Sequence, residues 1–151
     1  MPTAAAPRTT ADPSKADLAA SLRVSVARLA RVLRRQDNDD LTPTAWGALT
    51  TIFRDGPMTL GDVARSEHVS APTVTKVVEK LETAGLVTRV ADDGDRRVCR
   101  VQVSPAGRRR IEAIRAKRTA WLLDRLASLS EDELARLAAA APVLEKLGAQ
   151  E

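Results

Sequence analysis

Apolar positions repeat at helical spacing within residues 70–81. They recur every three or four residues, at Val74, Val77, Val78 and Leu81. This spacing predicts a helix with one apolar stripe that faces a core. Ser70 stands at the N-cap position, and Pro72 is tolerated in the first turn because amides there have no intrahelical partner.

The opposite side of this predicted helix is polar. It carries Thr73, Thr75, Lys76, Glu79, Lys80 and Thr83. Hydroxyl and lysine side chains near a helix N-terminus are groups that bond phosphates and base edges in DNA. An ordinary surface helix shows the same pattern, so the neighbouring segments decide between the two interpretations.

Three further helices are predicted before residue 70. Residues 14–35 carry an apolar stripe of Leu18, Leu22, Val26, Leu29, Val32 and Leu33. A second helix opens at Thr42-Pro43 and ends at the turn residues 55–57. A short helix over residues 59–67 opens with a capping box formed by Thr59 and Asp62. Since a tight connection joins that short helix to the helix at 70–81, the two predict a helix-turn-helix.

Two β-rich runs follow Gly85, which is expected to end the helix in a left-handed conformation. Residues 86–90 and 98–103 flank an Asp-Gly pair, which is a strong hairpin signal. Cys99, Val101 and Val103 share one strand face, so we expect Cys99 to be a buried, inert thiol. A helix-turn-helix followed at once by a basic hairpin predicts a winged-helix lobe over residues 44–103.

The expected fold class is therefore mainly α with a small β-hairpin wing. Two more helices are predicted, one opened by Ser104-Pro105 and one by a capping box at Ser130 and Glu133, with a kink at Pro142. The helices at 14–36 and 104–151 either add core to the same lobe or act as dimerisation helices that join two subunits. Residues 1–13, rich in Ala, Pro and Thr, are expected to be a flexible tail before one domain at 14–151.

Composition narrows the function classes. One His, one Cys and no Gly-rich phosphate loop give no catalytic pair or metal-ligand set, so we expect no enzyme activity, cofactor or metal. The net charge of +4 and the clustered arginines favour a polyanionic partner. Without a membrane-length apolar run or a signal-peptide core, the chain is expected to be cytoplasmic, with no membrane partner.

Beyond its first residues, the chain resembles the MarR family (multiple-antibiotic-resistance regulators). The most specific matching segments are residues 41–46, 69–76, 81–87 and 92–97, the last leading to Ser104-Pro105. The resemblance implies a homodimeric winged helix whose first and last helices interlock. It also implies a repressor of a nearby promoter, released when a small aromatic or lipophilic molecule binds beside the dimer helices.

Site residues also follow from the resemblance. It implies recognition-helix contacts at Ser70, Thr73, Thr75 and Lys76, and we add Pro72 and Lys80 from the same helix. In the wing, it implies that Asp95 braces Arg97 and that Arg96 contacts the minor groove or the backbone. Gly94 stands where many relatives carry a further arginine.

Some interpretations remain open at this point. Trp46 and Trp121 line an effector crevice or belong to core and interface. The expected partners are a pseudo-palindromic duplex, a second copy of the chain and a small effector. The alternatives are a constitutive DNA-binding regulator without an effector and a winged helix that binds another protein.

Overall fold

The computed structural model describes residues 14–36, 41–92, 94–95 and 97–149. The predicted tail at residues 1–13 lies outside this part. The chain forms two compact units, residues 1–36 and residues 37–151, and each is described by itself. The first contains helix α1 (Lys15–Arg34), which begins where the sequence predicts, because Ser14 Oγ accepts a hydrogen bond from the Asp17 amide at 3.2 Å.

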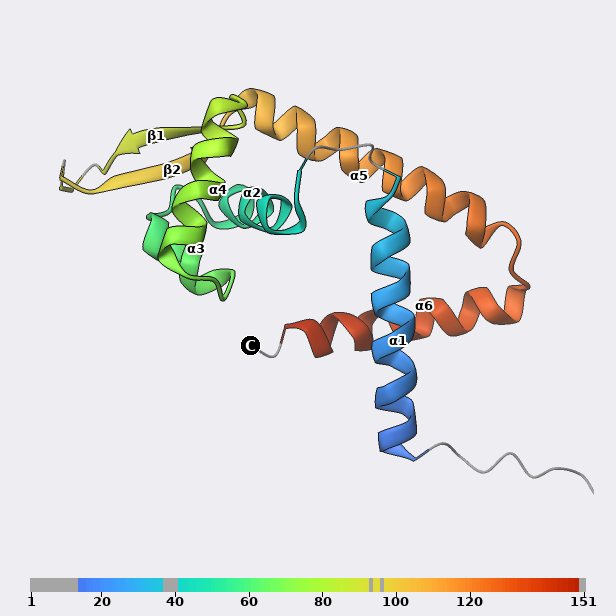
Figure 1. Cartoon of the computed structure of the whole chain (residues 1–151). Helices are drawn as coiled ribbons and strands as arrows, with labels where there is room; N and C mark the ends of the chain where they lie inside the picture. Colours follow the sequence, from blue (N-terminus) through green and yellow to red (C-terminus); the bar gives the residue numbers. More distant parts are fainter. Residues whose placement is uncertain (1–13, 37–40, 93, 96, 150–151) are drawn as a thin grey trace, which may run out of the picture. The chain divides into compact units, whose positions relative to one another are not determined.

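The second unit holds all the remaining elements (Figure 1). Helices α2 (Pro43–Asp55), α3 (Leu60–Ser66) and α4 (Ala71–Thr83) lead into strands β1 (Val87–Ala91) and β2 (Cys99–Val103). The strands pair antiparallel, with Val87 opposite Val103 and Ala91 opposite Cys99. Helices α5 (Pro105–Leu126) and α6 (Glu131–Gly148) follow. The mainly helical fold with a hairpin wing is as predicted, and we call the elements from α2 to β2 the lobe.

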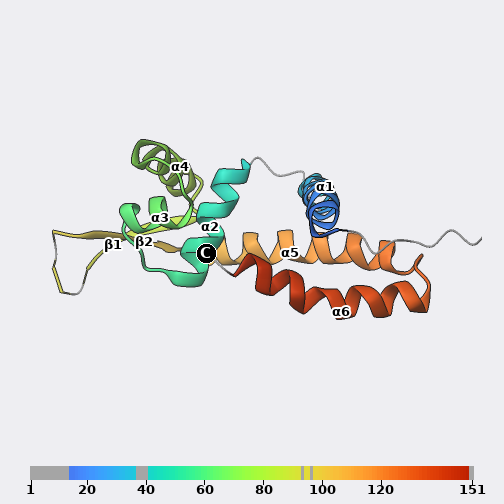
Figure 2. The ribbon, with the colours of Figure 1, turned by 90° about the horizontal axis from the view of Figure 1, so that it is seen from below.

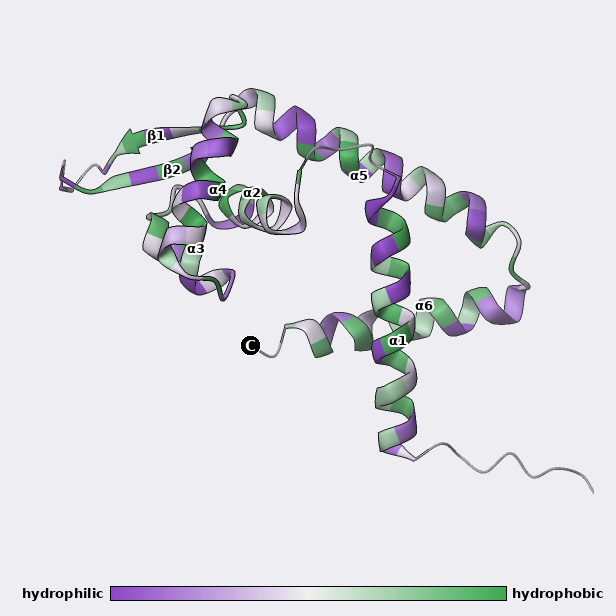
Figure 3. Cartoon of the chain, in the orientation of Figure 1, coloured by the Kyte–Doolittle hydropathy of each residue, from purple (hydrophilic) through white to green (hydrophobic). Residues whose placement is uncertain are grey.

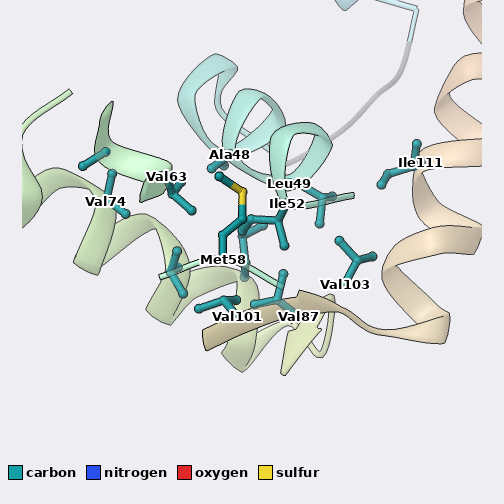
Figure 4. Close-up of a cluster of buried hydrophobic side chains, with 14 residues drawn as sticks. Ala48, Leu49, Ile52, Met58, Val63, Val74, Val87, Val101, Val103 and Ile111 are labelled. Carbon is teal, nitrogen blue, oxygen red and sulfur yellow. The ribbon is translucent and has the colours of Figure 1, made fainter. Parts of the chain in front are cut away.

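The core of the lobe is aliphatic (Figure 4). Its largest fully buried side chains are Leu49, Ile52, Val63, Val74, Val78, Leu81, Val87, Val101 and Ile111. They come from α2, α3, α4, both strands and α5, so every element around the core contributes to it. Full burial of one such side chain stabilises a fold by roughly 1.5–3 kcal/mol. The predicted apolar stripe of α4 is confirmed, since Val74, Val78 and Leu81 face this core.

Helix ends follow the predicted caps with one exception. Thr42 caps α2, and capping boxes at Thr59–Asp62 and Ser130–Glu133 open α3 and α6. Ser70 occupies the N-cap of α4, but its side chain makes no capping bond. Its Oγ instead lies 2.8 Å from Thr73 Oγ1. Ser70 therefore stands at the predicted N-cap position, but the predicted capping hydrogen bond is wrong. Its hydroxyl pairs with the Thr73 hydroxyl and accepts no hydrogen bond from a first-turn amide.

The far end of the hairpin differs from the prediction. Val101 and Val103 are buried as expected, but Cys99 is exposed. Cys99 pairs with Ala91 at the end of the strands away from the core, and both residues are exposed there. Strand alternation assigns Cys99 to the correct face, but it does not reveal how far along the strand that face is covered.

The turn after α4 joins it closely to the start of α5. Gly85 adopts φ 71°, as the sequence predicts. Ser104 Oγ donates a hydrogen bond to the Gly85 carbonyl at 2.6 Å and accepts one from the Gly107 amide at 3.0 Å. A side chain at Gly107 would overlap the backbone of Leu86, so the two segments touch through their main chains. This contact fixes where α4 ends relative to α5.

Candidate DNA-binding surface

The outer face of α4 presents most of the residues that the sequence singled out. Ser70, Pro72, Thr73, Lys76 and Lys80 are exposed. A shallow depression on this helix is lined by Lys76, Glu79, Lys80, Thr83 and Ala84. The apolar stripe of Val74, Val78 and Leu81 is buried in the core. The lysines of α4 therefore lie on its exposed side. Helix α4 therefore offers ammonium and hydroxyl donors to an anionic partner.

Two threonines of α4 use their hydroxyls differently. Thr75 is half-buried, and its Oγ1 donates to the backbone carbonyl of Ala71 at 3.0 Å. Thr73 is exposed, and its hydroxyl is paired with that of Ser70. A hydroxyl pair of this kind retains free lone pairs and exchanges partners readily. Thr73 is thus better placed than Thr75 to meet a base edge.

Asp92 organises the turn of the wing. Its Oδ1 accepts hydrogen bonds from the amides of Gly94 at 2.8 Å and Asp95 at 3.1 Å. Its Oδ2 pairs with the guanidinium of Arg100 on β2. The Arg100 side chain, followed by the two backbone amides, lowers the pKa of Asp92 below its ordinary value. One carboxylate therefore connects the two strands with the loop between them.

The predicted pair of Asp95 and Arg97 is present in another form. Asp95 Oδ1 accepts a hydrogen bond from the Arg97 backbone amide at 2.9 Å, and the described structure shows no ion pair between the two side chains. Arg97 is exposed. Arg96, the third wing residue of the prediction, lies outside the described residues. The prediction was that the side chains of Asp95 and Arg97 brace the hairpin. In the structure, the ion pair between Asp92 and Arg100 braces it.

An ion pair joins α4 to the wing. Arg89 Nε on β1 lies 3.0 Å from Glu82 Oε2 near the end of α4. The hydrogen bond that Arg89 donates to the Glu82 carboxylate is the main cause that raises the pKa of Arg89 above its ordinary value. Both side chains are partly exposed, so the pair adds little to the free energy of unfolding. It nevertheless couples the orientation of the hairpin to that of the helix.

Arginines of α5 stack on the aromatic rings of α2. The guanidinium carbons of Arg108 and Arg115 each lie 5.3 Å from the ring centre of Phe53. Arg118 lies 4.5 Å from the ring centre of Trp46. We call this contact the α2–α5 seam, comprising Phe53, Trp46 and the three arginines. It fixes the first half of α5 to the lobe, together with the buried side chains of Ile111 and Ile114.

The two tryptophans lie in different surroundings. Trp46 is half-buried in the seam, whereas Trp121 stacks with Arg125 of its own helix at 5.3 Å. Trp46 packs against the core of the lobe, consistent with the core alternative, whereas Trp121 is not part of that core cluster. The effector role given to Trp46 and Trp121 stays a prediction.

Similarity to known proteins identifies the class of this chain. The MarR family model matches residues 41–99. An HTH-type transcriptional regulator of Mycobacterium tuberculosis is 37% identical over 132 residues, which are 87% of this chain and 92% of that protein. The chain belongs to the MarR family.

Solved structures agree with this assignment. A putative transcriptional regulator from Pseudomonas aeruginosa is 36% identical with a TM-score of 0.77, covering 92% of this chain and 99% of that one. A MarR family protein from Bacillus stearothermophilus is 29% identical with a TM-score of 0.76, covering 89% and 95%. As a member of the MarR family, the chain is a DNA-binding transcription regulator and not an enzyme.

The described residues lack both a membrane-spanning helix and a cluster of metal ligands. They contain no helix long and apolar enough to cross a membrane. They also contain no group of three or more His, Cys, Asp or Glu side chains placed to hold a metal ion.

Sequence reasoning missed three residues that organise the site. Asp92 appears in the sequence as one of several turn aspartates, and Arg100 as one of many basic residues. Glu67 appears as an ordinary helix-terminal glutamate, although its side chain accepts a hydrogen bond from Thr51 Oγ1 of α2. The signal for Asp92 was present, because an aspartate two positions before a glycine commonly accepts hydrogen bonds from the turn that follows. No sequence signal indicates the partners of Arg100 and Glu67, which depend on tertiary packing.

Proposed function

We propose that this MarR-family chain is a homodimeric repressor that binds a pseudo-palindromic operator and is released by a small aromatic or lipophilic effector. The observation that carries the proposal is the location of the exposed apolar side chains. In the described residues, all the large ones lie on α1, the end of α5 or α6: Leu18, Val24, Val26, Leu29, Leu123, Leu137, Val143, Leu144 and Leu147.

These side chains need a partner. Val143 and Leu147 of α6 are each 58% exposed, and apolar residues recur along both α1 and α6 (Figure 3). No residue of either helix is buried. Apolar surface of this extent is unusual for a stable monomer and marks an interaction site. A second copy of the chain is the occupant that gives two lobes with the two-fold symmetry of a palindrome.

The DNA contacts of the proposal are those of the sequence analysis. In α4 they are Ser70, Pro72, Thr73, Thr75, Lys76 and Lys80, and in the wing they are Asp95, Arg96 and Arg97. A variant of S. aureus MepR, 19% identical with a TM-score of 0.66, was solved bound to an oligodeoxyribonucleotide. The repressor role is supported by Bacillus subtilis MdtR, an HTH-type transcriptional repressor that is 26% identical over 144 residues.

Light scattering and duplex binding test the proposal together. At micromolar concentration, scattering should give the mass of a dimer, and the promoter region beside the gene should be protected at two half-sites. A monomer that protects a single half-site would contradict the dimeric model. Benzoate and decanoate, as simple aromatic and lipophilic probes, should weaken the protected complex if an effector of this class acts.

A further inference from the structure

The described residues include two buried polar side chains, Thr51 and Ser104, which are 6% and 7% exposed. Both donate short hydrogen bonds to the turns that flank α4. Thr51 Oγ1 donates to Glu67 Oε1 at 2.5 Å, and Ser104 Oγ donates to the Gly85 carbonyl at 2.6 Å. Glu67 is the C-cap of α3, just before α4, and Gly85 follows the C-cap of α4. Each end of α4 is therefore connected to an element outside the helix-turn-helix.

The Glu67 carboxylate lies in a site on α2 formed by Gly47 and Thr51, which we call the Glu67 seat. It packs over Gly47, where a Cβ atom would overlap Glu67 Oε2. A glycine inside a helix lowers helix stability relative to alanine, so α2 has a locally costly residue at the point where the carboxylate lies. Thr51 stands one turn further along the same helix and supplies the hydrogen bond. Shape and hydrogen bonding together fix the Glu67 side chain.

Glu67 is close enough to α4 to influence its first turn. His68 follows it with φ 50°, and the Val69 amide donates to the Ala64 carbonyl at 3.1 Å. Val69 also packs against the core, and Ser70 comes next. Because these contacts hold the short connection in one conformation, a shift of Glu67 is passed on to Ser70. Helix α3 has seven residues, so it offers limited restraint of its own.

We propose that Glu67, held by Thr51, is a positioning residue for sequence-specific DNA recognition. A charge-assisted hydrogen bond is short and directional, whereas apolar contacts between helices allow small sliding movements. Base-edge hydrogen bonds need accurate placement of Ser70 and Thr73, while attraction to phosphates depends weakly on orientation. This inference rests on the proposed function, because it requires that the start of α4 reads an operator.

The test compares two variants that disturb the Glu67 seat with one that does not. Thr51→Val removes the donating hydroxyl at nearly constant volume, and Gly47→Ala displaces the carboxylate without removing a polar group. The matched control is Thr50→Val, because the Thr50 hydroxyl bonds the carbonyls of Trp46 and Gly47 within its own helix, each at 2.9 Å. The probes are the duplex that wild-type protein selects most strongly from a randomised pool and a scrambled duplex of equal composition.

Both seat variants should bind the selected duplex about tenfold more weakly, the scale of one lost base contact. Their affinity for the scrambled duplex should stay within about twofold, because phosphate contacts set that affinity. Thr50→Val should match wild type on both duplexes. Glu67→Gln keeps an acceptor oxygen and should preserve most of the discrimination, while Glu67→Ala should lose it. Thermal unfolding of each variant checks that the fold persists. If Thr51→Val does not fold, the duplex discrimination of Gly47→Ala tests the positioning role of Glu67.

Two outcomes would overturn the inference and are distinguishable. If Gly47→Ala and Glu67→Ala keep wild-type discrimination, Glu67 has no positioning role and the proposed function stands. A wild-type protein that selects no duplex over the scrambled one would contradict the proposed function, and this inference with it.

Discussion

At the scale of single residues, the outer face of α4 gives a direct test of DNA reading. Thr73 and Lys76 are exposed and stand outside the core, so changing them leaves packing intact. Thr73→Ala and Lys76→Ala should each weaken binding to the selected duplex by ~1–3 kcal/mol if they contact bases. Fluorescence anisotropy with labelled duplex measures this change. Lys117→Ala, on α5, removes the same charge from another helix and serves as the control.

Asp92 gives a second prediction at this scale. Asp92→Ala should free the amides of Gly94 and Asp95, so their hydrogen exchange should quicken while that of the Val87 amide on β1 stays unchanged. The pKa of Asp92 is lower in the folded protein than in the unfolded chain. Its stabilising contribution is therefore complete above the unfolded pKa of about 3.9 and is lost as the pH falls through the folded value.

An acid titration followed by NMR checks the sign of that dependence. The Gly94 amide shift should begin to move below the ordinary aspartate range, and Asp92→Asn should remove the movement. A midpoint above the ordinary range would contradict the role of Arg100 and the loop amides.

At the scale of elements, the α2–α5 seam decides how firmly the lobe is attached to α5. Exposed cation–π contacts contribute ~0.5–1 kcal/mol each. A double-mutant cycle on Phe53→Leu and Arg115→Ala should therefore give a coupling free energy of about that size in urea unfolding. The matched cycle with Arg109→Ala should give none, because Arg109 does not stack on the Phe53 ring in the described structure and is exposed. Equal coupling in the two cycles would show that general charge effects, not stacking, join α2 to α5.

Elements were predictable from sequence where local signals decide, and less so where packing decides. The stripe of α4, the boxes at Thr59 and Ser130 and the αL glycine at 85 follow from short-range rules, and the structure confirms them. The prediction that Cys99 is buried was wrong, because strand alternation does not show how far the core extends along the hairpin. Glu67 and Arg100 escaped notice because their partners, Thr51 and Asp92, are placed by the fold. The contact residues of α4 and the wing came from family resemblance, and their roles stay predictions.

At the scale of the whole molecule, the exposed apolar faces of α1 and α6 imply assembly. Figure 2 shows α6 as one helix, with Pro142 inside it, and the kink predicted at this proline stays a prediction. Leu144→Glu places a charge among Val143, Leu144 and Leu147 and should shift the protein towards monomer in light scattering. Its affinity for a two-half-site duplex should fall, while its affinity for a single half-site should match wild type. Ala138→Glu, on the same helix among exposed residues, is a control for added charge.

The scarcity of aromatic residues has a practical consequence for spectroscopy. The chain contains no tyrosine and two tryptophans, so its intrinsic fluorescence comes from Trp46 and Trp121. Trp46 lies under Arg118 in the contact between α2 and α5, whereas Trp121 lies further along α5. A Trp121→Phe protein would thus emit from a single indole at the joint between the DNA-reading lobe and its supporting helix. Such a protein would report movement at that joint without any attached dye.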